Sequence, residues 1–197
     1  MFNDTSSTLA LLRTRRSGRP RDLVEPGPDA AELREILALA TRVPDHGKLA
    51  PWRFIHVAKD ARDAFADLLE RAYRAGKAED PGRLEIEAAH RFAHQAPELV
   101  VALSSPDAGT KIPLWEQELS CGAACMTLLL AAHAMGFAGG WVTGWAAYSP
   151  EVLAGLGGRD GERIAGFLFL GTPGAPLEER IRPSVDHVAS EWTPARP

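Results

Sequence analysis

The segment from Trp115 to Met135 constrains the fold of this chain most, because it is a long predicted helix that is apolar through its middle. It ends before Gly136, a residue type that commonly follows a helix C-terminus because it adopts left-handed backbone conformations without strain. Within the helix, the sequence SCGAAC offers almost no side-chain bulk. Another backbone can therefore approach it closely, either a neighbouring helix or a symmetry-related copy of the chain.

Shorter helical and strand patterns alternate irregularly around this long helix. Three of the other predicted helices are Thr8–Arg15, Ala61–Ala75 and Ala78–Gln95. A fourth begins after Asp29, its N-cap, has Glu32 as the capping-box partner and ends before Pro44. The predicted strands are Trp52–Val57, Leu99–Leu103 and Ile164–Leu170, with 139–144 as a further short strand or turn. The regular spacing of a doubly wound sheet is missing, so the sequence predicts an α+β fold.

Composition narrows the class of protein. The 197 residues are 45% hydrophobic and 24% charged, which is typical of one globular domain over residues 1–197. The net charge of −4 argues against nucleic acid or an anionic membrane as general partner. The apolar stretches are far shorter than the about 18 residues of a membrane-spanning helix. The first residues lack the pattern of a secretory signal, so we expect a cytoplasmic protein. The tail after Gly171 carries five prolines, and we expect it to wrap over a partner subunit.

A basic cluster follows the first predicted helix. Arg15, Arg16, Ser17 and Arg19 lie in a segment where Gly18 and a proline interrupt regular structure. Guanidinium groups and a serine hydroxyl together suit a phosphate group. The alternative is a solvated basic loop. A nucleic-acid contact is less favoured, because no recognition motif is present and no aromatic residues interleave with the arginines.

Two further segments are candidates for ligand binding. The first is the turn-rich loop that contains Arg42 and His46, although a lone histidine in a polar loop is often merely solvated. The second contains Gly140, Trp141, Val142 and Thr143 after Gly139. Paired glycines there allow close approach of the backbone to a flat ligand, which Trp141 would flank. The alternative is a tight turn with a core tryptophan. The sequence contains no GxGxxG, P-loop, GxSxG or HExxH motif.

The cysteines and the remaining histidines favour structural roles. Cys121 and Cys125 are four residues apart on one predicted helix face, and two cysteines are too few for a structural zinc site, so we expect them to pack in the core. His90 and His94 have helical spacing but no glutamate between them, and we expect no metal there. We expect His133 to be a satisfied core or interface histidine.

Five short motifs, taken in order, make the chain similar to the FMN-dependent nitroreductase family, in its compact bacterial YdjA-like branch. The motifs are RRS at 15–17, PDH at 44–46 leading to PW at 51–52, PLWEQE at 113–118, GFAGGW at 136–141 and FLFLGTP at 167–173. The resemblance covers nearly the whole chain. It implies a central, mostly antiparallel sheet flanked by helices, and an intertwined homodimer with FMN bound at the subunit interface.

The resemblance also implies roles for individual residues. Arg15, Arg16 and Ser17 would hold the phosphate and ribityl end of FMN, and Arg19 would lie near the pyrimidine edge of the ring. Arg42 and His46 would reach the same cofactor from the other subunit. The residues expected to line the flavin are Gly140, Trp141, Val142 and Thr143.

The chain departs from the wider family at Lys48, where relatives often have asparagine, and at Ala50, where glutamine commonly precedes the PW pair. These departures put the usual side-chain hydrogen bonds to the ring in doubt. Arg180 and Arg182 follow the Gly-Thr-Pro sequence at 171–173, and the resemblance assigns neither of them a role.

The chemistry that the resemblance implies needs no catalytic side chain. Flavin N5 would accept hydride from NADH or NADPH and pass it to a small electron-poor acceptor such as a nitroaromatic or a quinone. Two alternatives remain open at this point. One is another flavin reaction, dehydrogenation or dehalogenation, and the other is a non-enzymatic FMN-binding sensor or storage protein. The acceptor and the choice between NADH and NADPH are also open.

Overall fold

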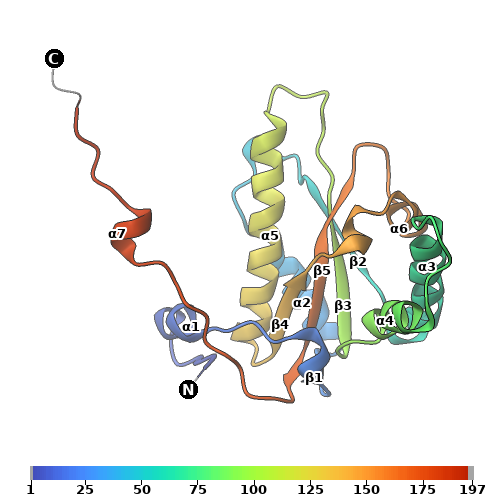
Figure 1. Cartoon of the computed structure of the whole chain (residues 1–197). Helices are drawn as coiled ribbons and strands as arrows, with labels where there is room; N and C mark the ends of the chain where they lie inside the picture. Colours follow the sequence, from blue (N-terminus) through green and yellow to red (C-terminus); the bar gives the residue numbers. More distant parts are fainter. Residues whose placement is uncertain (1, 195–197) are drawn as a thin grey trace.

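The sheet is organised around one central strand (Figure 1). The computed structural model describes residues 2–194. The strands are β1 (Leu23–Val24), β2 (Trp52–His56), β3 (Glu98–Ser104), β4 (Ala138–Val142) and β5 (Arg163–Pro173). The same β5 residues pair with both β3 and β4, so those two strands flank β5 on opposite edges. Strand β2 lies outside β3, and β1 pairs with the end of β5. All pairings among the described strands are antiparallel, which confirms the predicted α+β class.

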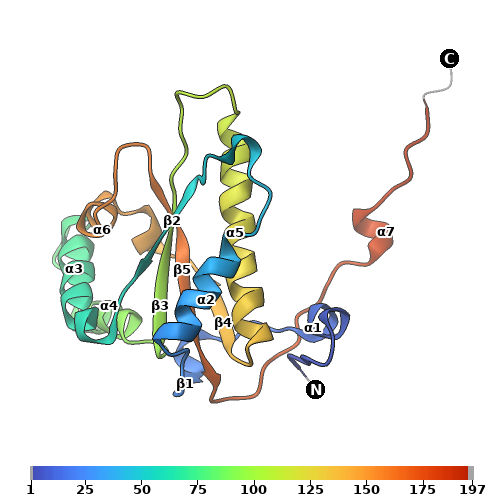
Figure 2. The same cartoon turned by 180° about the vertical axis from the view of Figure 1, so that it is seen from behind.

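Helices cover both faces of this sheet (Figure 2). One face carries α2 (Ala30–Ala40) and α5 (Leu114–Ala134), and the other carries α3 (Arg62–Ala75), α4 (Arg83–Ala93) and α6 (Pro150–Gly155). The alternation of side chains along β3 explains this division: Leu99 and Val101 pack into the core beneath α3 and α4, whereas Val100 packs beneath α5. No helix among residues 2–194 is long and apolar enough to cross a membrane.

Local sequence signals set most of the helix boundaries. Asp29 caps α2 with the predicted capping box, since its carboxylate accepts from the N–H of Glu32 and the Glu32 side chain accepts from the N–H of Asp29. After α5, Gly136 has a positive φ of 93°, as expected for a residue that follows a helix end. The predicted helix 78–95 was too long. Helix α4 begins only at Arg83, because Pro81 and Gly82 interrupt helical backbone.

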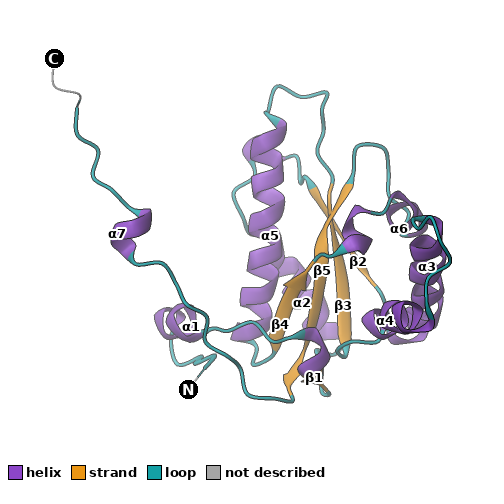
Figure 3. Cartoon of the chain, viewed as in Figure 1, coloured by secondary structure: helices purple, strands orange, loops and turns teal. Residues whose placement is uncertain are grey.

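Several short elements complete the chain (Figure 3). Helix α1 (Thr8–Thr14) is capped by Ser7. The single-turn helices are η1 (Pro20–Asp22), η2 (His46–Lys48), η3 (Lys59–Ala61), η4 (Trp145–Tyr148) and α7 (Val185–Val188). After β5 the tail passes α1 and then leaves the body of the protein, and it carries α7. Ile181 and Trp192 in this tail are 101% and 85% exposed, so the other described residues leave their apolar side chains largely uncovered.

A buried carboxylate anchors the loop that enters β5. Glu162 is 6% exposed and forms a bidentate pair with Arg53 of β2, with Nε–Oε1 and Nη2–Oε2 distances of 2.8 and 2.7 Å. It also accepts hydrogen bonds from the Ser105 hydroxyl at 2.7 Å and from the Arg159 N–H at 2.8 Å. The bond from Arg53, with smaller effects from the other donors, lowers the pKa of Glu162 to about 2.

This lowered pKa predicts an acid-dependent loss of stability. The ordinary pKa of a glutamate is 4.5, so the contribution of Glu162 is fully present above about pH 4.5 and disappears as the pH falls towards 2. At 1.36 kcal/mol per pKa unit it amounts to about 3 kcal/mol. We expect Glu162→Gln to lose most of this at pH 7 and to show a smaller further loss at pH 3 than the wild type, measured by urea unfolding. Equal acid losses in the two proteins would contradict the assignment.

Candidate functional site

Two segments that are far apart in the sequence meet at the outer edge of the sheet. The N–H of Gly18 donates to the carbonyl of Gly139 at 3.0 Å, which attaches the arginine segment to β4. Gly140 lies so near this segment that a Cβ atom added to it would be 2.5 Å from the carbonyl oxygen of Gly18. The structure therefore brings Arg15, Arg16 and Ser17 beside the predicted flavin-lining segment. Only glycine at position 140 permits this approach.

The main chain of Arg16 is held from several sides. Its N–H donates to Oδ1 of Asn3 at 2.8 Å, and its carbonyl oxygen lies 3.1 Å from Nε2 of His133 in the last turn of α5. Its guanidinium Nη1 donates to the carbonyls of Arg13 at 3.2 Å and Arg15 at 2.8 Å. Arg16 is thus a fixed element of the site and not a solvated surface side chain.

The electrostatics of this segment favour an anion. Desolvation first, and then the nearby positive charges of Arg182 and Arg16, lower the pKa of Arg15. The Nε atom of Arg16 is buried and has no hydrogen-bond partner among the described residues. A cluster of like charges with an unsatisfied donor is costly unless an anion neutralises it.

Two carboxylates of the tail already occupy part of this position. Glu179 pairs with Arg16, and Glu178 pairs with Arg19. Ser17 and Arg19 also line a cavity of about 260 Å³ that the tail closes with Glu178 and Arg180. The arginine segment therefore binds anionic oxygens in this structure, which is the property that a phosphate site requires.

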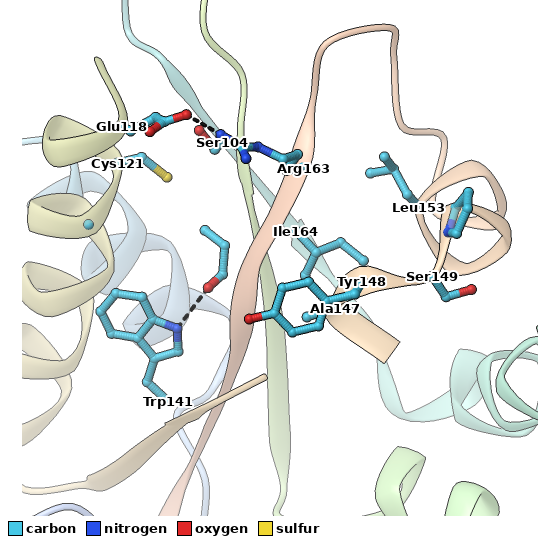
Figure 4. Close-up of a pocket in the computed structure, with 13 residues that line it drawn as sticks. Ser104, Glu118, Cys121, Trp141, Ala147, Tyr148, Ser149, Leu153, Arg163 and Ile164 are labelled. Carbon is cyan, nitrogen blue, oxygen red and sulfur yellow. Dashed lines mark hydrogen bonds and ion pairs between the residues drawn. The ribbon is translucent and has the colours of Figure 1, made fainter. Parts of the chain in front are cut away.

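Trp141 forms a wall of a larger cavity of about 500 Å³ (Figure 4). Its indole N–H donates to the carbonyl of Ala165 at 3.0 Å, and the side chain is 38% exposed, so it is not the core tryptophan of the alternative interpretation. Ser104, Cys121 and Tyr148 line other parts of the cavity, beside an ion pair between Glu118 and Arg163. Val142 is half-buried and Thr143 is exposed.

His46 lies apart from the arginine segment. Nδ1 of His46 is 2.7 Å from Oε2 of Glu116 in the first turn of α5, whereas Arg16 contacts His133 in the last turn. At 1.5 Å per residue these two points of α5 are about 25 Å apart. Arg42 lines an open cavity of about 380 Å³ between α1, α2 and α5. No hydrogen bond or ion pair among residues 2–194 joins Arg42 or His46 to the arginine segment.

The loop that holds His46 has an unusual backbone. Lys48 and Ala50 have positive φ angles of 57° and 48°, a region that side chains other than glycine and asparagine adopt with strain. The carboxylate of Asp45 supports this conformation by accepting from the N–H groups of Leu49 and Ala50 at 3.0 and 2.9 Å. The two positions at which the sequence departs from the wider family are therefore the two left-handed non-glycine residues of this loop.

The other candidate side chains occupy structural positions. Cys121 and Cys125 are free and buried, as predicted. His90 lies 2.7 Å from Glu70, and His94 lies 3.3 Å from Asp63, so each histidine faces a separate carboxylate of α3. His133 is fully buried, as predicted for a core histidine.

Sequence reasoning missed the groups that support the arginine segment from a distance. Asn3, the His133 contact with Arg16, and the pairing of Glu178 and Glu179 with the arginines were not predicted. These contacts join residues that are 13 to 163 positions apart, and no local pattern marks them. Only the run of arginines was visible as a signal.

Comparison with known proteins gives one consistent result. The family model described as "Nitroreductase family" matches residues 12–172. YdjA of Escherichia coli strain K12, which carries a provisional name as an NAD(P)H nitroreductase, is 37% identical over 165 residues, covering 84% of this chain and 87% of YdjA.

Solved structures agree with this result. A nitroreductase-like family protein from Bacillus cereus superposes with a TM-score of 0.78 at 22% identity, covering 96% of this chain and 98% of that one. A nitroreductase from Bacteroides fragilis that was solved with bound FMN gives a TM-score of 0.67 at 26% identity, covering 89% and 94% of the two chains.

Proposed function

The chain belongs to the nitroreductase family of oxidoreductases, and from this premise we propose that it binds FMN and transfers hydride from NADH or NADPH to a small electron-poor acceptor. A nitroaromatic or a quinone is the acceptor class that this chemistry suits. The observation that carries the proposal is the contact between Gly18 and β4, because it places an anion-binding segment beside a glycine-lined edge of the sheet. The relative from B. fragilis binds FMN, and the name of YdjA specifies NAD(P)H.

The residues of this segment fit the phosphate end of FMN. The buried Nε of Arg16 has no partner among the described residues, and carboxylate oxygens of the tail already approach Arg16 and Arg19. We assign the phosphate and ribityl contacts to Arg15, Arg16 and Ser17. A phosphate would give the buried donor its missing acceptor and offset the repulsion among the guanidinium groups.

The edge of β4 suits a flat ring. Gly140 lets the arginine segment lie directly against this edge, and Trp141 supplies an aromatic wall beside it, so we assign Gly140, Trp141, Val142 and Thr143 to the flavin ring. When bound, FMN supplies the hydride-accepting atom N5. Arg19 is assigned to the pyrimidine edge, where a cation stabilises the negative charge that develops on reduction.

A second copy of the chain is part of the proposal. Through its middle, helix α5 carries apolar residues on both its sheet-facing and its outer side, but only one side packs on the sheet of its own chain. Apolar side chains left exposed on α1 and the start of α5 are Leu9, Leu12, Leu114, Trp115 and Leu119. We propose that a homodimer covers this face.

A homodimer would also account for the distance between His46 and the arginine segment. His46 lies at the far end of α5 from the arginine segment of its own chain, and neither it nor Arg42 forms a hydrogen bond or ion pair with that segment within residues 2–194. A partner packed on α5 with two-fold symmetry would bring its own Arg42 and His46 towards the cofactor of the first chain. The exposed tail, with Ile181 and Trp192, would extend over the partner.

The proposal predicts a direct spectroscopic result. The purified protein should retain FMN, and anaerobic addition of NADH or NADPH should bleach the flavin absorbance. A nitroaromatic or a quinone added next should restore the oxidised spectrum. Flavin that neither nicotinamide bleaches would contradict hydride transfer and favour the sensor or storage function. Rapid reduction without reoxidation by either acceptor class would instead favour a dehydrogenation or dehalogenation on the same scaffold, which product identification would distinguish.

A further inference from the structure

We propose that His133 is a positioning residue for FMN, because its imidazole turns the peptide between Arg16 and Ser17 so that the N–H of Ser17 faces the phosphate. The inference rests on the proposed binding of FMN. It adds a buried residue of α5 that would act on the cofactor through the main chain of Arg16, and it explains how the basic segment acquires a defined shape.

The side chain of His133 lies between two carbonyl oxygens. Nε2 is 3.1 Å from the oxygen of Arg16, and Nδ1 faces the oxygen of Leu129 one turn earlier in α5. Burial lowers the pKa of His133 despite these two acceptors, which favours the neutral ring. A neutral imidazole has one N–H. On Nε2 this proton donates to Arg16, whereas the Leu129 carbonyl that faces Nδ1 already has a backbone N–H of the helix as its donor.

Peptide geometry connects this bond to the ligand site. The carbonyl of Arg16 and the N–H of Ser17 belong to the same planar trans peptide group, so they point in opposite directions. Because His133 holds the carbonyl towards the interior of the protein, the N–H of Ser17 points away from α5. None of the hydrogen bonds among residues 2–194 uses this N–H as a donor. It is free to bind an anion next to the guanidinium groups.

Neighbouring contacts leave this peptide few alternative orientations. Asn3 fixes the N–H of Arg16 at 2.8 Å, and Gly139 fixes the N–H of Gly18 at 3.0 Å. The carbonyl of Arg16, which lies between these two points, is the group whose direction His133 sets. Without a donor at this position the part-buried carbonyl loses its partner, unless the peptide rotates. Rotation would turn the N–H of Ser17 away from the anion.

Three substitutions of His133 distinguish the contribution of Nε2 from that of Nδ1. His133→Gln places an amide donor near the position of Nε2, His133→Asn places one near Nδ1, and His133→Leu provides neither. We expect the Kd of apoprotein for FMN, measured by quenching of flavin fluorescence, to rise about 10-fold in the Leu and Asn variants, because the carbonyl of Arg16 is left without its donor. The Gln variant should remain within about 3-fold of the wild type. Leu128→Ala, a core substitution in the same helix, should lower the Tm without changing the Kd.

Riboflavin, which lacks the phosphate, distinguishes positioning from general structural damage. If His133 acts through the N–H of Ser17, the Leu and Asn variants should lose affinity for FMN but keep the wild-type affinity for riboflavin. Equal losses for both flavins, equal Kd values for the Asn and Gln variants, or an unchanged Kd in all three would overturn the inference. If His133→Leu fails to fold, the Asn and Gln pair still decides. A wild-type protein that binds no FMN would instead overturn the proposed function itself.

Discussion

Replacing Gly140 with alanine is expected to abolish the retention of FMN during purification. The added Cβ would be 2.5 Å from the carbonyl oxygen of Gly18 and 3.3 Å from Cδ of Pro20. The first of these contacts is with backbone, which cannot rotate away as a flexible side chain can. The arginine segment would therefore have to separate from β4, breaking the hydrogen bond between Gly18 and Gly139. We expect the Kd for FMN to rise about 100-fold or more, because the phosphate and ring contacts would no longer be held together.

Gly76→Ala is the matched control for this substitution. Gly76 also lies outside a helix interior and has a negative φ of −84°, but a Cβ there meets nothing closer than 3.5 Å. This variant should bind FMN like the wild type. The two proteins are compared by fluorescence titration, with circular dichroism to show that both are folded. A Gly140→Ala protein that retains FMN at the wild-type Kd would mean that the flavin does not depend on the contact between the arginine segment and β4.

The second large effect is expected from Ala123→Glu on the outer face of α5. Ala123 is half-buried within one chain and shares a helix face with Leu119, Met126 and Leu130. In a monomer the new carboxylate would reach water. In a homodimer it would be buried against apolar groups without a partner, at a cost of several kcal/mol. We expect the wild type to have twice the 21.3 kDa mass of the chain and the variant to be a monomer by sedimentation analysis.

Loss of the dimer should also weaken the binding of the cofactor. If Arg42 and His46 serve the cofactor of the partner, the monomeric variant should bind FMN at least about 10-fold more weakly. Leu84→Glu is the control, since Leu84 is 67% exposed on α4 and the same charge there is solvated. A monomeric variant with unchanged FMN affinity would refute the shared site. A wild type that sediments as a monomer would refute the dimer.

Much of the fold could be predicted from local patterns. The capping box at Asp29, the strand over Leu99–Leu103 and the long helix before Gly136 all appear in the structure close to their predicted bounds. These features depend on interactions between residues a few positions apart, such as caps and hydrophobic periodicity. A short segment of the sequence is therefore enough to predict each of them. The helix predicted over 78–95 was wrong at its start, because Pro81 and Gly82 prevent helical backbone.

Less of the candidate site than of the fold could be predicted from the sequence. The run of arginines predicted an anion site, and the paired glycines predicted close approach to a flat group, but each signal alone also fitted a solvated loop or a tight turn. The pattern of five motifs supplied the family. It did not show which groups hold Arg16 in place.

The sequence by itself determined the elements, the family and the types of residue available to bind a phosphate. Only the tertiary structure decided that Gly18 lies against Gly140, that His133 holds the peptide of Arg16, and that His46 lies at the opposite end of α5 from Arg16. The physical reason is the separation of these residues along the chain. Their contacts arise from sheet pairing and the packing of α5, which no window of neighbouring residues contains.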